Sequence, residues 1–102
     1  MPDYELTAHA EKDLKRIACY TIETWGLKQA KHYESLLADR FQKIAQSRLA
    51  PKPFLSHRSN LLFTLCEHHY IFYCTRADQP PLILAIFHER MDLMQRLKNR
   101  LT

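Results

Sequence analysis

The spacing of hydrophobic residues changes halfway along the chain, and this change constrains the fold more than any other feature. Over residues 7–25 and again over about 27–47, apolar residues recur every three or four positions, the period of an amphipathic helix. From Leu61 onward they form short β-branched and aromatic runs that are typical of strands. This order predicts two helices that share a sheet as their apolar partner.

A single glycine separates the two helical segments. Gly26 is the only glycine in 102 residues, and we expect it in the left-handed position that ends the first helix and starts a helical hairpin. Thr7 is placed to cap the first helix. The scarcity of glycine excludes the glycine-rich loops that bind nucleotide phosphates, so no nucleotide cofactor is expected.

The second half predicts an antiparallel meander of strands. Pro51 and Pro53 stop helical continuation, and residues 52–60 are expected to form an exposed loop. Strands are expected at 61–66, 70–75 and 82–87, with turns at 67–69 and 78–81. A brief alternation at 4–7 adds an edge strand.

The third strand runs directly into the cluster His88-Glu89-Arg90-Met91-Asp92, which starts a basic helix. Asp92 followed by Gln95 has the spacing of a helix-capping box, and Met91 is expected to pack. His88 and Arg90 are left as the candidates for contact with a target, together with three cations of the closing helix, Arg96, Lys98 and Arg100.

These segments describe one α+β domain over residues 1–102, in the order strand, helix, helix, strand, strand, strand, helix. The sheet is expected to be small and mainly antiparallel, with the helical hairpin packed on it. No apolar run approaches the roughly 18 residues of a membrane span, and no signal peptide is evident, so a soluble, cytoplasmic protein is expected.

Net charge and one Cys-His spacing bear on the possible partners and metal ligands. The formal charge of +4 indicates an acidic partner without identifying it. Cys66 and His68 have a spacing that could place them on one face of a strand, but two ligands do not make a zinc site, so no metal is expected.

Four motifs together resemble the ParE-type toxins of bacterial type II toxin-antitoxin modules. They follow the family order along nearly the whole chain: Ala10-Glu11-x-Asp13-Leu14-x-x-Ile17-x-x-Tyr20, Trp25-Gly26-x-x-Gln29-Ala30-x-x-Tyr33, Ile71-Phe72-Tyr73 and Ile86-Phe87-His88-x-Arg90-Met91-Asp92. The resemblance implies a RelE/ParE-like fold, which agrees with the element order reached from the hydrophobic pattern.

The resemblance also implies a function. Such toxins inhibit DNA gyrase by stabilising its cleaved-DNA complex, which blocks replication, and they contact DNA only through gyrase or the antitoxin complex. A cognate antitoxin, ParD-like or a similar small DNA-binding protein, keeps them silent. Exposed aromatic residues would contact its tail, with Trp25, Tyr33 and Phe54 as the candidates, although core packing is the favoured alternative for Trp25 and Tyr33.

Relatives on the same fold are ribosome-dependent endoribonucleases of the RelE type, so an enzyme remains the alternative. Metal-independent RNA cleavage needs a proton acceptor, an acid and cations around the phosphate. The residues that could supply these roles are Lys52, His57, Arg58, Arg76, His88 and Arg90. Residues 61–66 and 70–75 carry no Lys or Arg, which favours a binding protein over an enzyme. An inactive remnant that only binds an antitoxin is the third possibility.

Overall fold

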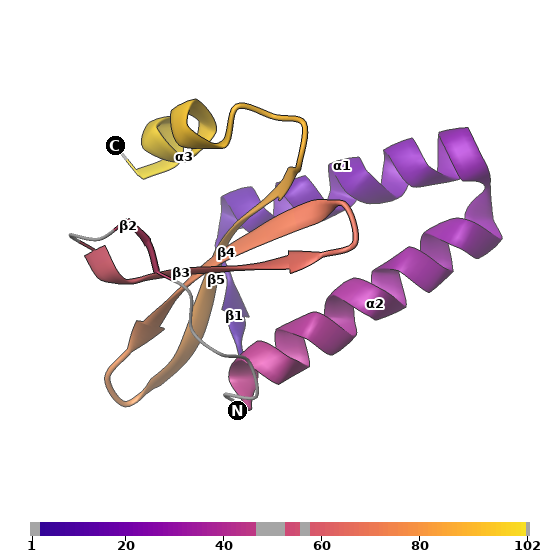
Figure 1. Ribbon diagram of the computed structural model, residues 1–102. Helices are drawn as coiled ribbons and strands as arrows, with labels where there is room; N and C mark the ends of the chain where they lie inside the picture. The colour runs from indigo at the N-terminus through magenta and orange to yellow at the C-terminus, as the bar shows by residue number, and fades with distance from the viewer. Residues whose placement is uncertain (1–2, 47–52, 56–57, 102) are drawn as a thin grey trace.

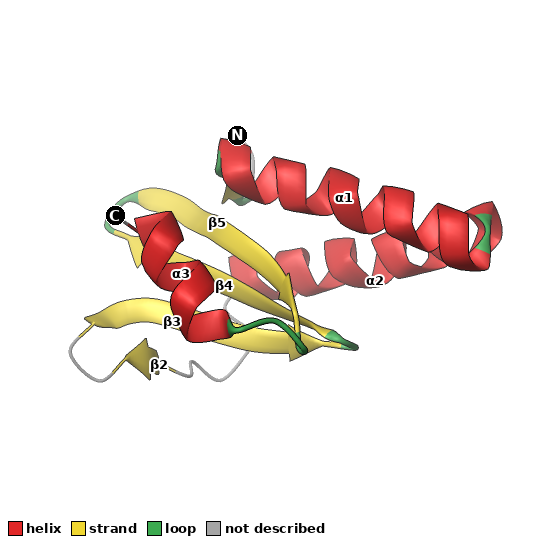
Figure 2. Cartoon of the chain, turned by 90° about the horizontal axis from the view of Figure 1, so that it is seen from above, coloured by secondary structure: helices red, strands yellow, loops and turns green. Residues whose placement is uncertain are grey.

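A mixed sheet with helices on both faces forms the framework of the molecule (Figures 1 and 2). The computed structural model describes residues 3–46, 53–55 and 58–101. In chain order the elements are β1 (Glu5–Leu6), α1 (Ala8–Trp25), α2 (Leu27–Ala45), β2 (Pro53–Leu55), β3 (Arg58–Cys66), β4 (His69–Arg76), β5 (Gln79–His88) and α3 (Leu93–Leu101). The α+β class and the predicted order of elements are confirmed, with β2 as an added strand.

The sheet has five strands in the order β1-β5-β4-β3-β2. The pairs β5–β4, β4–β3 and β3–β2 are antiparallel, whereas β1 runs parallel to β5, with Glu5 opposite Leu82 and Leu6 opposite Ile83. Because β1 has only two residues, most of the outer edge of β5 extends beyond it.

The prediction of a loop over residues 52–60 is wrong for residues 53–55, which form β2, and from Arg58 onward, where β3 begins. Pro53 lies opposite Leu62 on the outermost strand, and proline is tolerated on edge strands because one side of such a strand has no neighbour to accept a hydrogen bond. Arg58 lies opposite Leu55, so pairing with a neighbouring backbone extends β3 into polar sequence. Lys52 and His57 lie outside the described residues.

The strands also meet at tighter turns than the sequence indicated. Glu67 and Asp78 have positive φ values of 55° and 58°, which lets two-residue turns connect β3 to β4 and β4 to β5. As a result β5 begins at Gln79, although the two following prolines predicted a turn. The Arg76 guanidinium donates two hydrogen bonds to the carbonyl of Pro80, at 3.1 and 2.7 Å, and supports this start.

Gly26 alone connects α1 to α2. Its N–H donates to the carbonyl of Ile22 at 2.9 Å, and its carbonyl accepts from the N–H of Ala30 at 3.1 Å, so it ends one helix and begins the next. The predicted positive φ is confirmed at +93°, but ψ is 168°. The residue therefore lies outside the left-handed helical region, in a region that essentially only glycine occupies.

Replacing Gly26 with alanine is expected to lower the free energy of unfolding by about 1 to 3 kcal/mol. The cause is backbone strain alone, because a Cβ atom at this position would meet nothing within 4 Å. Urea denaturation of the variant measures the loss. A variant as stable as the wild type would show that the connection adopts another conformation in solution.

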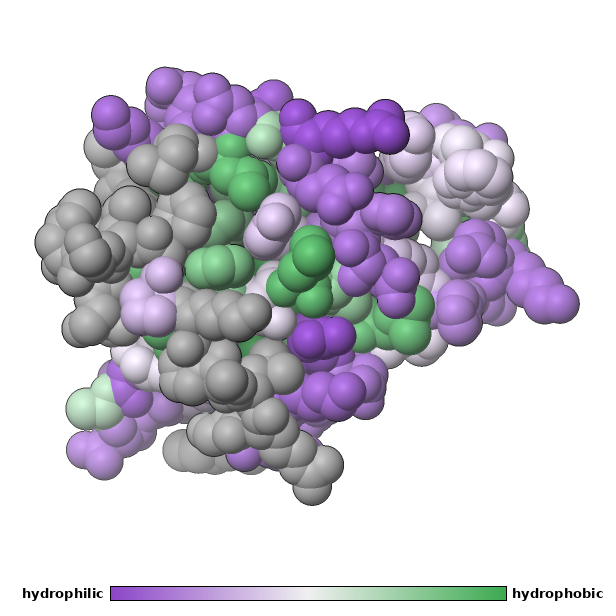
Figure 3. Space-filling view, in the orientation of Figure 1, coloured by the Kyte–Doolittle hydropathy of each residue, from purple (hydrophilic) through white to green (hydrophobic). Residues whose placement is uncertain are grey.

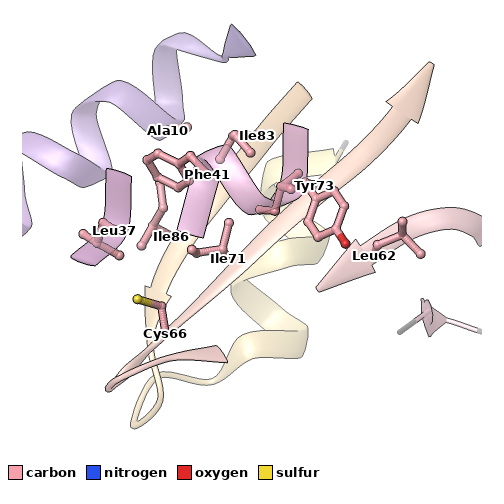
Figure 4. Close-up of a cluster of buried hydrophobic side chains, with 10 residues drawn as sticks. Ala10, Leu37, Phe41, Leu62, Cys66, Ile71, Tyr73, Ile83 and Ile86 are labelled. Carbon is pink, nitrogen blue, oxygen red and sulfur yellow. The ribbon is translucent and has the colours of Figure 1, made fainter. Parts of the chain in front are cut away.

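Two hydrophobic cores lie on opposite faces of the sheet. On the hairpin side, Leu37 and Phe41 of α2 pack against Ile71, Ile83 and Ile86 (Figure 4). On the other side, Leu97 of α3 packs with a second set made up of Leu61, Phe72, Ala85 and Phe87. Each apolar face of the sheet is therefore covered by helix, one by the hairpin and the other by α3.

The far end of the helical hairpin projects past the sheet (Figures 1 and 2). Trp25, expected within the buried face of the first helix, is 70% exposed, and Ile22 is 44% exposed. Periodicity alone predicted burial here, but it carries no information on where the covering sheet ends. Within the described residues, no helix combines the length and hydrophobicity needed to cross a membrane.

Candidate functional site

Three histidines gather where the β3–β4 turn meets the end of β5. The rings of His69 and His88 lie edge to face at 5.1 Å, and those of His68 and His88 stack at 6.3 Å. This proximity follows from the sheet register, in which His69 lies directly opposite His88. Sequence analysis singled out His88 but missed His69, although the pairing of the strands that flank the turn could have suggested it.

Tyr33 of α2 connects the helical hairpin to this group. Its hydroxyl donates to the carbonyl of Cys66 at 3.3 Å and lies 2.5 Å from Nδ1 of His69. A hydroxyl has one proton, so we assign the proton of the second bond to His69 Nδ1. Burial raises the pKa of Tyr33 to about 12, and it lowers the pKa of His69 to about 4, with a further contribution from the charges of His88 and His68.

The segment after β5 is held by hydrogen bonds within the turn. His88 Nδ1 accepts from the N–H of Arg90 at 3.1 Å, and the His88 carbonyl accepts from the N–H of Met91 at 3.0 Å. Glu89 pairs with His68 at 3.0 Å. These bonds give His88 a structural role at Nδ1, while the side chain of Arg90 is exposed. Met91 packs against the core beneath α3, as expected.

The cap of α3 is confirmed. Asp92 Oδ1 accepts from the N–H of Gln95 at 3.2 Å, which satisfies a backbone donor of the first turn. The Gln95 side chain donates to Asn99 at 3.1 Å and extends along the helix instead of back to the cap. Arg96 and Lys98 are exposed on this helix, as target-binding candidates should be.

Arg100 has a structural role that the sequence did not predict. Its guanidinium donates to both carboxylate oxygens of Asp13, at 3.1 and 3.3 Å, and to the carbonyl of Leu84 at 2.9 Å. It also lies 5.0 Å from the centre of the Phe87 ring. With a side chain only 16% exposed, Arg100 offers much less surface to a target than Arg90 or Arg96 does.

Asp13 completes this buried pair at the edge of β5. It is 4% exposed and also accepts from the backbone N–H of Ile86 at 3.1 Å. A bulge at Leu84 interrupts the ladder here, because Phe72 lies opposite Ala85 while the next residue of β4 lies opposite Ile83. Asp13 and Arg100 thus satisfy backbone groups of β5 beyond the short β1.

Among the described residues, the candidates for RNA cleavage divide between the two ends of the sheet. His88 and Arg90 lie at or just after the end of β5, whereas Arg76 ends β4 at the opposite end of the sheet, where it pairs with Glu5 at 3.5 Å. Since β4 has eight residues, the two ends lie roughly 23 Å apart. Arg58 begins β3, and the remaining two candidates, Lys52 and His57, lie outside the described residues.

The three antitoxin-binding candidates are also dispersed. Trp25 lies at the end of the hairpin, and Tyr33 is half-buried beside His69, as core packing predicted for it. Phe54 belongs to β2. The backbones of the three residues therefore lie at separate places in the fold, and their contact with an antitoxin stays a prediction. Within the described residues, no group of three or more His, Cys, Asp or Glu side chains could hold a metal ion.

His69 is expected to make the stability of the fold depend on pH. Its pKa is about 4 in the folded protein and 6.5 as its ordinary value, so between these values the unfolded chain binds a proton that the folded chain does not. The free energy of unfolding should fall as the pH falls from 6.5 to 4. After discounting for partial exposure of the ring, the loss is about 1 to 2 kcal/mol. Urea denaturation of the wild type and of His69→Gln across this range measures it; parallel curves for the two proteins would contradict the assignment.

The sequence of the chain matches a known protein family over most of its length. A family described as "ParE toxin of type II toxin-antitoxin system, parDE" matches residues 4–93. The chain belongs to this ParE toxin family. This ParE-family chain is 43% identical over 101 residues to Toxin ParE of Escherichia coli, covering 99% of the chain and 98% of that protein. The resemblance of its sequence motifs to ParE-type toxins is confirmed.

The fold of the ParE-family chain is also found in a solved structure. A chain of the chromosomal ParDE TA system from P. aeruginosa superimposes with a TM-score of 0.70 at 16% identity, covering 83% of this chain and 92% of that one. At that identity the likeness shows the fold alone. It supports the α+β architecture of helices packed on a small mixed sheet.

Proposed function

We propose that this ParE-family toxin inhibits DNA gyrase by binding to it and stabilising the gyrase-cleaved DNA complex. The observation that carries the proposal is the 43% identity to Toxin ParE of Escherichia coli across nearly the whole chain. That match spans both the helical hairpin and the segment after β5. A cognate antitoxin of the ParD type neutralises the toxin in this account.

The geometry favours binding over RNA cleavage as the mode of action. Cleavage of an RNA phosphate requires an acid, a base and cations within hydrogen-bond reach of one phosphate. Of the described candidates, Arg76 is held at the other end of the sheet by Pro80 and Glu5. His88 and Arg90 are adjacent, but the His88 Nδ1 atom is occupied by a backbone N–H. A surface that contacts gyrase or its bound DNA needs no such convergence.

Induction of the toxin in bacterial culture tests the mode of action. Incorporation of labelled thymidine and labelled leucine is followed in parallel, with and without the co-expressed antitoxin. A gyrase inhibitor is expected to stop thymidine incorporation first, and the antitoxin to restore it. Early loss of leucine incorporation, with thymidine incorporation continuing, would instead favour a ribosome-dependent RNase.

Arg90 is the target-binding candidate that this assay tests most cleanly. Its exposed side chain can be removed without disturbing the turn, because the bond from Arg90 to His88 comes from the backbone N–H. Loss of one charge-assisted contact should raise the toxin dose needed for growth arrest about tenfold in Arg90→Ala. Lys43→Ala, which removes a cation from α2, serves as the control. Equal potency of the two variants would show that the Arg90 side chain does not contact the target.

A further inference from the structure

The end of the α1–α2 hairpin carries an unusual concentration of exposed hydrophobic side chains. Among the described residues, five large hydrophobic side chains are exposed, and four of them flank Gly26: Tyr20 at 63%, Ile22 at 44%, Trp25 at 70% and Leu27 at 57%. The fifth is Leu65 on β3. Single exposed apolar residues are normal on protein surfaces, whereas a cluster of them marks a contact surface. We call these four residues the hairpin tip.

The shape of the hairpin tip restricts what can cover it. The two helices extend past the sheet and project as a finger, which Figures 1 and 2 show from two directions. The direct connection through Gly26, with hydrogen bonds to Ile22 and from Ala30, leaves no loop that could fold back over the tip. A convex apolar surface is buried only by a concave partner. A flexible peptide that folds on binding buries more apolar surface in a groove than on a convex tip.

Charge around the hairpin tip indicates an acidic partner. Residues 15–32 contain four cations, Lys15, Arg16, Lys28 and Lys31, against a single acid, Glu23. All five side chains are exposed. In Figure 3 the hairpin end, at the right, is pale with hydrophilic purple beside it. An acidic rim around an apolar cleft complements this arrangement, and complementary charge would also accelerate association.

The aliphatic members of the hairpin tip favour a protein over a nucleic acid. A single strand of DNA would stack its bases on Tyr20 and Trp25 and place its phosphates near the lysines. Ile22 and Leu27 would gain little from such a ligand, whereas an apolar protein cleft buries all four residues. Trp and Tyr are also the residues most enriched among those that dominate protein–protein affinity.

We propose that the hairpin tip inserts into an apolar cleft with an acidic rim on the folded protein target of the toxin. The inference rests on the proposed function in one respect, which is that gyrase is the protein that supplies the cleft. The cations after β5 and on α3 are then a second region of contact, separate from the tip in the sequence and in the fold.

Matched substitutions test the proposal. Trp25→Ala removes the most exposed member of the tip, and Leu27→Ala is compared with Leu65→Ala, the same change at an exposed leucine outside the tip. Lys28→Glu is compared with Lys43→Glu in the same way. Circular dichroism establishes that each variant is folded. Potency is measured as the dose that arrests growth and as the concentration that half-inhibits gyrase supercoiling.

Trp25→Ala is expected to lower both potencies by about 30-fold or more, the usual effect of removing a dominant contact. Leu27→Ala and Lys28→Glu are each expected to lower them by about tenfold, and both controls to stay within about threefold of wild type. Growth arrest that is unchanged in Trp25→Ala and Leu27→Ala would overturn the proposal, whether or not antitoxin binding falls.

Two further results separate the possible errors. If the wild type arrests growth but leaves gyrase unaffected, the proposed target is wrong, and the growth-arrest comparison still tests the hairpin tip. Trp25 is the only tryptophan of the chain, so its fluorescence reports on the tip alone. Strong quenching of the Trp25 fluorescence by a single-stranded oligonucleotide at physiological salt would overturn the proposal, because it would show that the tip binds a nucleic acid.

Discussion

Replacing Asp13 with alanine is expected to lower the free energy of unfolding by about 3 to 5 kcal/mol, because it leaves a partner charge unpaired in a nearly dry site. Asp13 is 4% exposed, and its carboxylate accepts from Arg100 and from the N–H of Ile86. Without the Asp13 carboxylate, the Arg100 guanidinium still donates to the Leu84 carbonyl. The Ile86 N–H loses its side-chain acceptor. The loss should also loosen α3, which carries Arg100.

Asp39→Ala is the matched control, because it removes a carboxylate from an exposed ion pair. Asp39 is 66% exposed and lies 3.3 Å from Lys43, four residues further along the helix. Such pairs contribute roughly 0.3 to 0.5 kcal/mol. Urea denaturation at neutral pH compares the two variants. Similar small losses for both would contradict a stabilising role for the pair that joins α1 to α3.

Phe72→Ala is expected to cost about 3 to 5 kcal/mol, the typical effect of removing a fully buried aromatic ring. Phe72 is 0% exposed at the centre of the α3-side core. Its ring lies 5.9 Å from that of Phe87 and 6.3 Å from that of Phe63. The cavity would open on the face of the sheet that α3 covers, so the helix is expected to lose protection from hydrogen exchange before α1 and α2 do.

Leu65→Ala provides the comparison on the neighbouring strand. Leu65 is 42% exposed, so its removal creates no enclosed cavity and should cost less than about 1 kcal/mol. Thermal or urea denaturation of both variants measures the difference. Equal losses would mean that the α3 side of the sheet is not packed as the structure describes.

The hydrophobic pattern was sufficient to predict the main elements of the fold. The helical period predicted α1 and α2, and the β-branched and aromatic runs predicted β3, β4 and β5. Residue type and position also predicted the helix caps at Thr7 and Asp92, whose side chains accept hydrogen bonds from the N–H groups of Ala10 and Gln95. These features depend on neighbours within a few residues, so the sequence contains the information directly.

Features that depend on distant partners were missed. β2 is a strand only because β3 lies beside it, and Pro53 gave the opposite indication. Trp25 continues the apolar period of α1 but lies beyond the edge of the sheet, so the pattern predicted burial where the structure has exposure. Whether an apolar helix face is covered depends on the length of its partner, which is not a property of the helix itself.

For the candidate site too, the sequence predicted the exposed arginines but not the one that pairs with a distant residue. Arg90 and Arg96 are exposed, as expected of residues that contact a target. Arg100, on the same basic helix, is instead paired with Asp13, 87 residues away in the sequence. Charge pattern could not distinguish these arginines, because the bulge at Leu84 and the short β1 create the need for Arg100.

A supercoiling assay with purified gyrase, plasmid DNA and the purified chain tests directly whether the chain inhibits gyrase. We expect the chain to inhibit supercoiling and cleaved plasmid to accumulate when the reactions are stopped with detergent. Adding the cognate antitoxin first is expected to prevent both effects. Normal supercoiling at a large excess of the chain, together with codon-aligned cuts when the chain is added to translating ribosomes, would contradict the proposed inhibition of gyrase.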